Sequence, residues 1–152
     1  MTTELSVHAI HQGGMRVLAG TSDHKVLMDY PLQPGMTGEG LTPLQMLLAS
    51  LAACSANSVM VILKKMNQTI TGLEVEAHGL RRQEHPTVLT GISLEFLVKG
   101  SGIDEEAVAR ALKLSEEKLC PVWNMLKGRT PITTSVKITE VPAPDAAGCP
   151  AS

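Results

Sequence analysis

An apolar stretch from Pro43 to about Met66 constrains this 152-residue chain more than any other feature. Thr42 and Pro43 are typical of an N-cap and a first helical residue, and a helix over this stretch is roughly 35 Å long. It is long enough to be a candidate membrane span, but polar residues interrupt it and its neighbours are amphipathic, so we expect no membrane. These polar residues are Gln45, Ser50, Ser55, Asn57 and Ser58.

A helix that is apolar on nearly every face belongs in the centre of a core when the protein is soluble. A chain of this size has little left with which to cover such a helix. Exposure in a monomer would leave an apolar patch of several hundred Å² or more. We therefore expect an obligate homodimer in which a second copy of the chain covers the helix.

The remaining segments predict strands on either side of this helix and a second helix near the C-terminus. Apolar and polar residues alternate in several short stretches, and a loop rich in Pro and Gly precedes the long helix. Asp104 to Glu106 places acids in the first turn of the second helix. The expected strands cover 3–10, 16–21, 25–29, 73–78, 92–99 and 132–139.

The second helix has an inner stripe of small and apolar residues. Pro121 ends this helix and can begin another short turn, which ends near Gly128. The resulting order is βββ-α-ββ-α-β, an α+β fold with antiparallel pairing. We expect residues 1–140 to form a single domain and residues 141–152 a disordered tail. The inner stripe consists of Val108, Ala111, Leu112, Ser115 and Leu119.

Charge and composition exclude some classes of function. The net charge is −2, and the chain has one Trp, one Tyr and one Phe. A nucleic-acid binder needs a basic surface or stacking aromatics, so we expect no nucleic-acid partner. The N-terminus lacks the basic start and apolar run of a signal peptide, so we expect a cytoplasmic protein. In the reducing cytoplasm a cysteine pair is more often catalytic than structural.

Two of the three cysteines are candidates for redox chemistry. Cys54 lies in the middle of the long helix, and Cys120 directly precedes Pro121, where the N-terminus of a new helix would favour its thiolate. The alternative is that both are buried and inert. Cys54 needs a nearby cation, for which Arg16 is the best candidate, although an arginine in such a strand can also be an ordinary surface residue. Cys149 is expected to be a spare thiol.

Metal chemistry is not expected from the sequence. The five histidines and three cysteines include no Cys-x-x-Cys or His-Glu-x-x-His spacing. The Gly-rich stretch from Gly35 to Gly40 lacks the Lys-Ser/Thr of a phosphate-binding loop and is expected to be a mobile loop. No metal ligand is therefore predicted.

The chain resembles the OsmC/Ohr family, named after osmotically inducible protein C and organic hydroperoxide resistance protein. The resemblance covers residues 5–140 and is most specific in TPLQMLLASLAACSANSV and LKLSEEKLCPVWNMLKG. It implies an intertwined homodimer with active sites at the subunit interface. It also implies a thiol peroxidase without a cofactor, in which Cys54 attacks an organic hydroperoxide, Cys120 resolves the sulfenic acid to a disulfide, and a dithiol reduces that disulfide.

One part of the chain departs from the family pattern. Hydroperoxide reductases of this family carry a Glu in the first turns of the central helix that pairs with the catalytic arginine. Here the stretch reads Leu44-Gln45-Met46, so Gln45 would take the orienting role without a charge. Arg81 and Arg82 are alternatives to Arg16. The alternative function is a non-catalytic protein that binds small apolar molecules.

Overall fold

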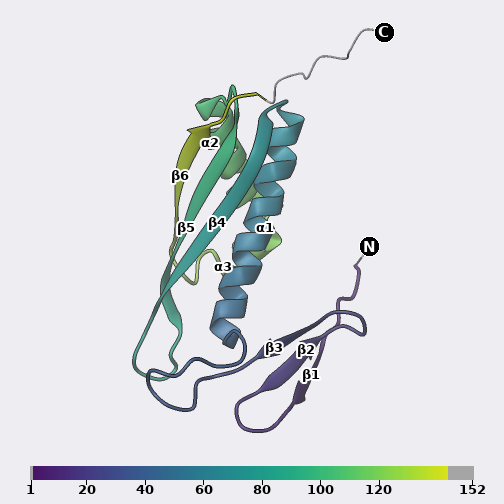
Figure 1. Ribbon diagram of the computed structural model, residues 1–152, viewed down its shortest axis with the longest axis vertical. Helices are drawn as coiled ribbons and strands as arrows, with labels where there is room; N and C mark the ends of the chain where they lie inside the picture. The colour runs from purple at the N-terminus through teal and green to yellow at the C-terminus, as the bar shows by residue number, and fades with distance from the viewer. Residues whose placement is uncertain (1, 144–152) are drawn as a thin grey trace, which may run out of the picture. The chain divides into compact units, whose positions relative to one another are not determined.

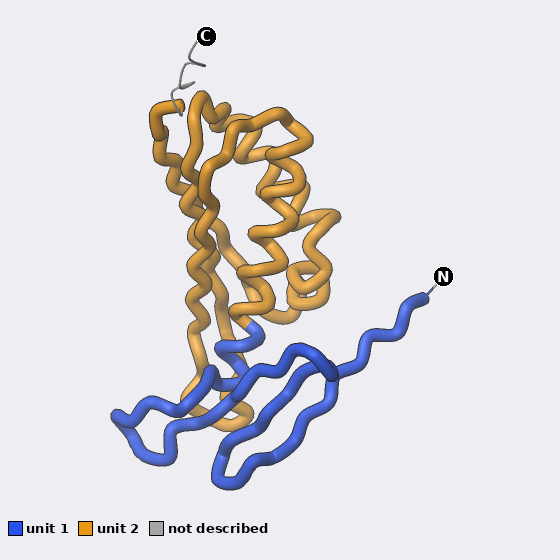
Figure 2. The backbone as a smooth tube through the Cα atoms, turned by 45° about the vertical axis from the view of Figure 1, so that its right-hand side comes forward, with its two compact units in different colours: residues 1–47 blue, residues 48–152 orange. Residues whose placement is uncertain are grey.

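The computed structural model describes residues 2–143 and divides the chain into two compact units, 1–47 and 48–152 (Figure 2). The expected tail, apart from residues 141–143, and Cys149 lie outside the described residues. The expectation that residues 1–140 form a single domain stays a prediction.

The N-terminal unit contains a small antiparallel sheet of β1 (His8–His11), β2 (Val17–Gly20) and β3 (Lys25–Met28). Gly13 and Gly14 both have positive φ, which lets the chain turn between the first two strands. The loop that follows β3 is closed at its base, where the Asp29 amide donates to the Leu41 carbonyl at 3.1 Å. All three strands were predicted, with β1 shorter than expected.

Helix α1 (Pro43–Lys65) begins at the residue that the sequence predicted. Thr42 and Gln45 form a reciprocal capping box, since the Gln45 amide donates to Thr42 Oγ1 at 3.3 Å and the Thr42 amide donates to Gln45 Oε1 at 2.8 Å. The capping box gives hydrogen-bond acceptors to two backbone amides that have no carbonyl partner within the helix. The cap thus fixes where the helix starts.

The C-terminal unit is a three-stranded sheet with helices on one side (Figures 1 and 2). The strands are ordered β4-β5-β6, and the two long strands β4 and β5 form an antiparallel hairpin. The elements are β4 (Thr69–Arg81), β5 (Leu89–Ser101), α2 (Glu105–Leu114), the π-helical turn η1 (Ser115–Leu119), α3 (Pro121–Leu126) and β6 (Ile132–Glu140).

The last strand corrects the expectation of antiparallel pairing throughout. β6 runs parallel to β5, with Ile92 opposite Ile132 and Gly100 opposite Glu140. The helical segment between the two strands carries the chain back to the start of β5, as a crossover between parallel strands must. Alternation of apolar residues specifies a strand but not its direction, so the sequence pattern could not reveal this.

The core lies between the sheet and the helices. Alternate residues of β5 are buried, which agrees with the predicted period of two, and α1 presents a stripe that includes Leu51, Val59 and Leu63, all 0% exposed. Leu119 was expected in the inner stripe of the second helix but is 49% exposed. The π turn widens the helix at residues 115–119 and moves Leu119 off the stripe, while Cys120 becomes fully buried.

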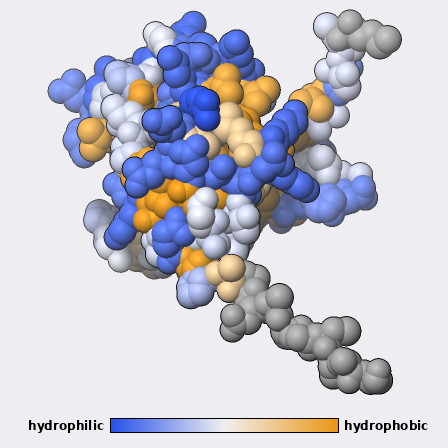
Figure 3. All heavy atoms as spheres, turned by 90° about the horizontal axis from the view of Figure 1, so that it is seen from above, coloured by the Kyte–Doolittle hydropathy of each residue, from blue (hydrophilic) through white to orange (hydrophobic). Residues whose placement is uncertain are grey.

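Much of α1 is only partly covered by its own chain. Within residues 2–143, α1 is the one helix that is long and apolar enough to cross a bilayer, and its most apolar 18-residue window has a mean hydropathy of 2.0. Only 28% of that window is buried. Val61, for instance, is 49% exposed. Hydrophobic residues also emerge between hydrophilic ones on the face drawn in Figure 3. One side of α1 therefore packs in the core, and apolar side chains on its other sides remain partly exposed to solvent.

Candidate active site

Cys54 and Cys120, which lie 66 positions apart in the chain, meet in the C-terminal unit. The Cys120 thiol donates to the Cys54 sulfur at a separation of 3.0 Å, and both cysteines are free. Cys54 comes from the middle of α1, and Cys120 is the N-cap of α3. The two thiols are close enough to join as a disulfide after an approach of about 1 Å, because that bond is roughly 2.05 Å long.

The two sulfurs differ in access. Cys120 is 0% exposed and belongs to the hydrophobic core, whereas Cys54 is half-buried. A dissolved molecule can therefore reach Cys54 and not Cys120.

Helix α3 directs two backbone amides at the two thiols. Pro121 occupies the first helical position, where a missing N–H costs nothing. The next amide, that of Val122, lowers the pKa of the Cys54 thiol, and the Trp123 amide donates to Cys120 Sγ at 3.4 Å. The sequence predicted Cys120 at an N-cap but not this division of the amides.

The backbone around Cys120 is fixed from both sides. The Cys120 amide donates to the Ser115 carbonyl at 2.9 Å across the π turn. Asn124 Nδ2 donates to the Cys120 carbonyl at 2.9 Å and to the Glu116 carbonyl at 3.3 Å, which ties α3 to the preceding turn. Asn124 is thus a positioning residue that the sequence analysis missed, since an Asn in a helix is usually exposed.

Burial raises the pKa of the Cys54 thiol above its ordinary value, and the hydrogen bond and charge of Cys120 raise the pKa further. The backbone amide of Val122 acts in the opposite direction. Within this unit, then, Cys54 favours its protonated form. A nucleophilic Cys54 needs a positive charge from elsewhere, as the sequence indicated.

Ser55 is a second residue of the site that the sequence analysis treated only as an interruption of an apolar helix. Its side chain is 1% exposed, and its hydroxyl lies 3.5 Å from Cys120 Sγ. Cys120 therefore has the Trp123 amide and the Ser55 hydroxyl as hydrogen-bonding neighbours beside Cys54.

Arg16 lies in the N-terminal unit, directly before β2. Its Nη1 donates to Glu39 Oε2 at 3.2 Å, and the Glu39 amide donates to the buried Asp29 carboxylate at 3.0 Å. The carboxylate partner of Arg16 thus comes from the Pro- and Gly-rich loop and not from the helix. The amide oxygen of Gln45 is engaged in the helix cap, and its orienting role stays a prediction.

The alternative arginines are engaged within the hairpin between β4 and β5. Arg81 Nη2 donates to Thr87 Oγ1 at 2.8 Å, and Arg82 donates to the carbonyls of Glu84 and Pro86 at 3.1 Å and 2.6 Å. These contacts give both guanidinium groups a local structural role. The choice of Arg16 over Arg81 and Arg82 as the activating cation stays a prediction, since Arg16 is likewise engaged by Glu39.

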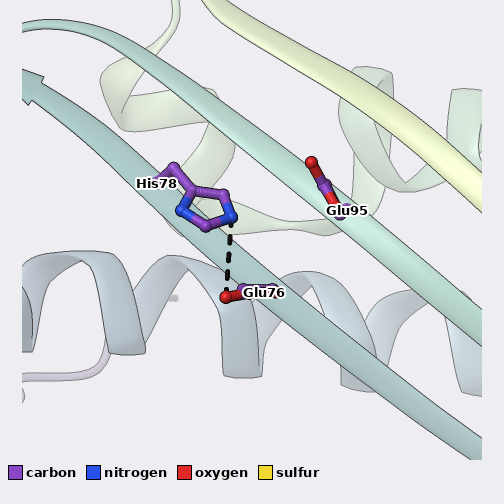
Figure 4. A group of neighbouring side chains, drawn as sticks. All are labelled: Glu76, His78 and Glu95. Atoms are coloured by element: carbon purple, nitrogen blue, oxygen red, sulfur yellow. Dashed lines mark ion pairs between the residues drawn. The ribbon is translucent and has the colours of Figure 1, made fainter.

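The exposed face of the sheet carries a cluster of possible metal ligands that the sequence pattern did not indicate. Glu76 and His78 of β4 and Glu95 of β5 point toward one another, with ligand atoms within 4.8 Å (Figure 4). His78 Nε2 lies 3.6 Å from Glu76 Oε1. All three side chains are exposed to solvent. Lys137 lines the same hollow as Glu76 and Glu95, so its positive charge can offset their negative charge without a metal ion.

Comparison with known proteins decides the family. The family described as OsmC-like protein matches residues 36–135. Protein YhfA of Escherichia coli K12 is 39% identical over 118 residues, which cover 77% of this chain and 84% of YhfA. The chain belongs to the OsmC-like family.

Solved structures agree with this assignment. A hypothetical protein from Aquifex aeolicus has a TM-score of 0.82 at 27% identity, over 93% of this chain and 100% of that one. The organic hydroperoxide resistance protein OhrB of Bacillus subtilis has a TM-score of 0.60 at 20% identity, over 87% and 96% of the two chains. The α+β fold is thus that of the OsmC-like proteins, while the identity to OhrB is too low to transfer its activity.

Proposed function

We propose that this protein is a cysteine-based thiol peroxidase that reduces organic hydroperoxides in defence against oxidative stress. The observation that carries the proposal is the 3.0 Å contact between the sulfurs of Cys54 and Cys120. A half-buried thiol in contact with a fully buried thiol is the arrangement needed for attack by the first and resolution by the second. Membership of a family that includes hydroperoxide resistance proteins supports the same chemistry.

The oxidative half of the cycle has two steps. The Cys54 thiolate attacks the terminal oxygen of the hydroperoxide, the O–O bond breaks, and an alcohol leaves as Cys54 becomes a sulfenic acid. The Cys120 thiolate then attacks the Cys54 sulfur, forming the disulfide and releasing water. A dithiol donor reduces the disulfide, so the cycle needs neither a metal nor an organic cofactor.

Arg16 is the proposed activating cation. The raised pKa of Cys54 in its own unit means that a positive charge has to offset the effect of burial, and Arg16 is held by Glu39 in the N-terminal unit. A guanidinium group can both favour the thiolate and hydrogen-bond a peroxide oxygen.

We also propose that the protein works as a cytoplasmic homodimer without a membrane or nucleic-acid partner. Only a small part of the apolar surface of α1 is buried in one chain, which supports the proposal that a second copy of the chain covers this helix. Packing of Leu51 and Val59 in the core at 0% exposure supports a core helix over a membrane span.

The test is consumption of tert-butyl hydroperoxide in the presence of a dithiol, measured on the wild-type protein and three single variants. Cys54→Ser should abolish consumption, and Cys120→Ser should accumulate a sulfenic acid on Cys54 that dimedone labels. Cys149→Ser is the matched control and should behave as wild type. If Cys54→Ser keeps single-turnover reactivity while Cys120→Ser loses it, the roles are reversed. If the wild-type protein consumes no hydroperoxide, the proposed activity is wrong and the alternative function, binding of small apolar molecules, is favoured.

A further inference from the structure

The Ser55 hydroxyl is unusual for a serine on a core helix. Among the hydrogen bonds of residues 2–143, its one partner is Cys120 Sγ. Ser58, one turn along α1, shows the ordinary arrangement, since its hydroxyl donates to the Cys54 carbonyl at 2.9 Å. A buried hydroxyl is costly without a good partner, and a neutral thiol is a weak one. Ser55 is better satisfied when Cys120 carries a negative charge.

The direction of the hydrogen bonds around Cys120 changes with its charge. As a thiol, Cys120 donates its proton to Cys54. As a thiolate, it can only accept, so the Ser55 hydroxyl and the Trp123 amide both become donors to the same sulfur. Hydrogen bonds to an ionised group are roughly twice as strong as neutral ones. Two hydrogen-bond donors, the Ser55 hydroxyl and the Trp123 amide, thus lie within reach of the Cys120 sulfur when it accepts.

Access determines which sulfur of the disulfide a reductant can reach. Thiol–disulfide exchange needs an approach of the attacking thiolate to one of the two sulfurs. Cys120 is 0% exposed and has Ser55 and Trp123 around its sulfur, whereas Cys54 is half-buried. Attack on Cys120 would have to come through the core.

We propose that the reductant attacks Cys54 and that Cys120 departs as a thiolate stabilised by Ser55 and Trp123. This inference rests on the proposed thiol-peroxidase cycle and concerns its reductive half. The donor thiolate forms a bond to Cys54 Sγ as the bond between the two cysteines breaks, and its electron pair goes to Cys120. The second thiol of the donor then attacks the mixed disulfide, frees Cys54 as a thiolate and leaves the donor as a cyclic disulfide. The protons released by the donor pass to the cysteine thiolates or to water.

Ser55 is a catalytic residue in this step, because its hydroxyl touches a reacting sulfur. Its removal should slow reduction without preventing the disulfide from forming. Loss of one hydrogen bond to a developing thiolate should reduce the rate about three- to tenfold. Ser58→Ala is the matched control, because it removes a hydroxyl from the same helix without touching Cys120.

The rate test starts from protein oxidised with diamide in a Cys149→Ser background, so it does not depend on peroxide consumption. Mass spectrometry first verifies that Cys54 and Cys120 are linked. Reduction by dithiothreitol is then followed by the fluorescence of Trp123, the one tryptophan, whose amide contacts Cys120. Ser55→Ala should be slower by the stated factor and Ser58→Ala unchanged. Equal rates in the two variants, or failure of diamide to link the pair, would overturn the proposal.

The second test locates the point of attack and needs no change at Ser55. Oxidised protein is mixed with glutathione, quenched with acid and alkylated, and the glutathione adduct is located by peptide mass spectrometry. An adduct on Cys54, with an alkylated Cys120, is the expected result. An adduct on Cys120 would refute the assignment. A protein that gives the expected adduct but consumes no hydroperoxide would contradict the proposed function and not this inference.

Discussion

Oxidation of the cysteine pair should stabilise the fold by an amount that follows from its place in the chain. A disulfide between Cys54 and Cys120 would close a loop of 66 residues. The entropy that such a loop removes from the unfolded chain corresponds to about 4 kcal/mol at 25 °C. The sulfurs already touch at 3.0 Å, so bond formation requires little movement of the folded chain. The full effect should therefore be close to this value, with a rise in Tm on the order of 10 °C.

The assay is urea denaturation followed by circular dichroism, on reduced and diamide-oxidised protein at the same subunit concentration. Equal concentrations matter because the apparent stability of a dimer depends on concentration. The dependence of the unfolding free energy on urea should also decrease on oxidation, because a cross-linked unfolded chain exposes less surface. Cys120→Ser, treated in the same way, should show no shift. A verified disulfide that leaves the urea midpoint unchanged or lowers it would refute the reasoning.

Two further predictions concern assembly and pH. Light scattering at micromolar subunit concentration should give twice the chain mass of 16.2 kDa, because α1 lacks cover in one chain, and a monomer mass would contradict this. Because burial and Cys120 raise the pKa of Cys54, its thiolate forms only at higher pH unless a cation opposes them, so Arg16→Met should move the rise of peroxide consumption to higher pH. An unchanged pH profile in Arg16→Met would exclude Arg16 as the activating group and direct attention to Arg81 and Arg82.

The local signals in the sequence were sufficient for the helices but not for the sheet. Thr42-Pro43 and Cys120-Pro121 each specify a helix start through their own backbone chemistry, and both starts are where the sequence placed them. The direction of β6 is a property of the whole segment between two strands. No residue of β6 itself carries that information, so the parallel pairing with β5 could not be predicted from its alternation.

The candidate site was likewise predictable only in part from the sequence. The types and positions of Cys54 and Cys120 suggested a redox pair, while the expectation that they meet depended on the family resemblance. Glu39 escaped notice because its contact with Arg16 joins positions 23 apart through an irregular loop. Ser55 escaped notice because a serine in an apolar helix usually bonds to its own backbone, as Ser58 does.

The division of amides at α3 bears on which cysteine attacks first. The sequence alone favoured Cys120 through its helix N-terminus and Cys54 through a cation. In the structure, the N-terminus of α3 acts on both thiols, since the Val122 amide lowers the pKa of Cys54 and the Trp123 amide donates to Cys120 Sγ at 3.4 Å. The N-terminus of α3 therefore does not single out Cys120 as the attacking thiol. Access is the difference that remains, and it supports Cys54 as the thiol that meets the hydroperoxide and later the reductant, with Cys120 kept in the core as its resolving partner.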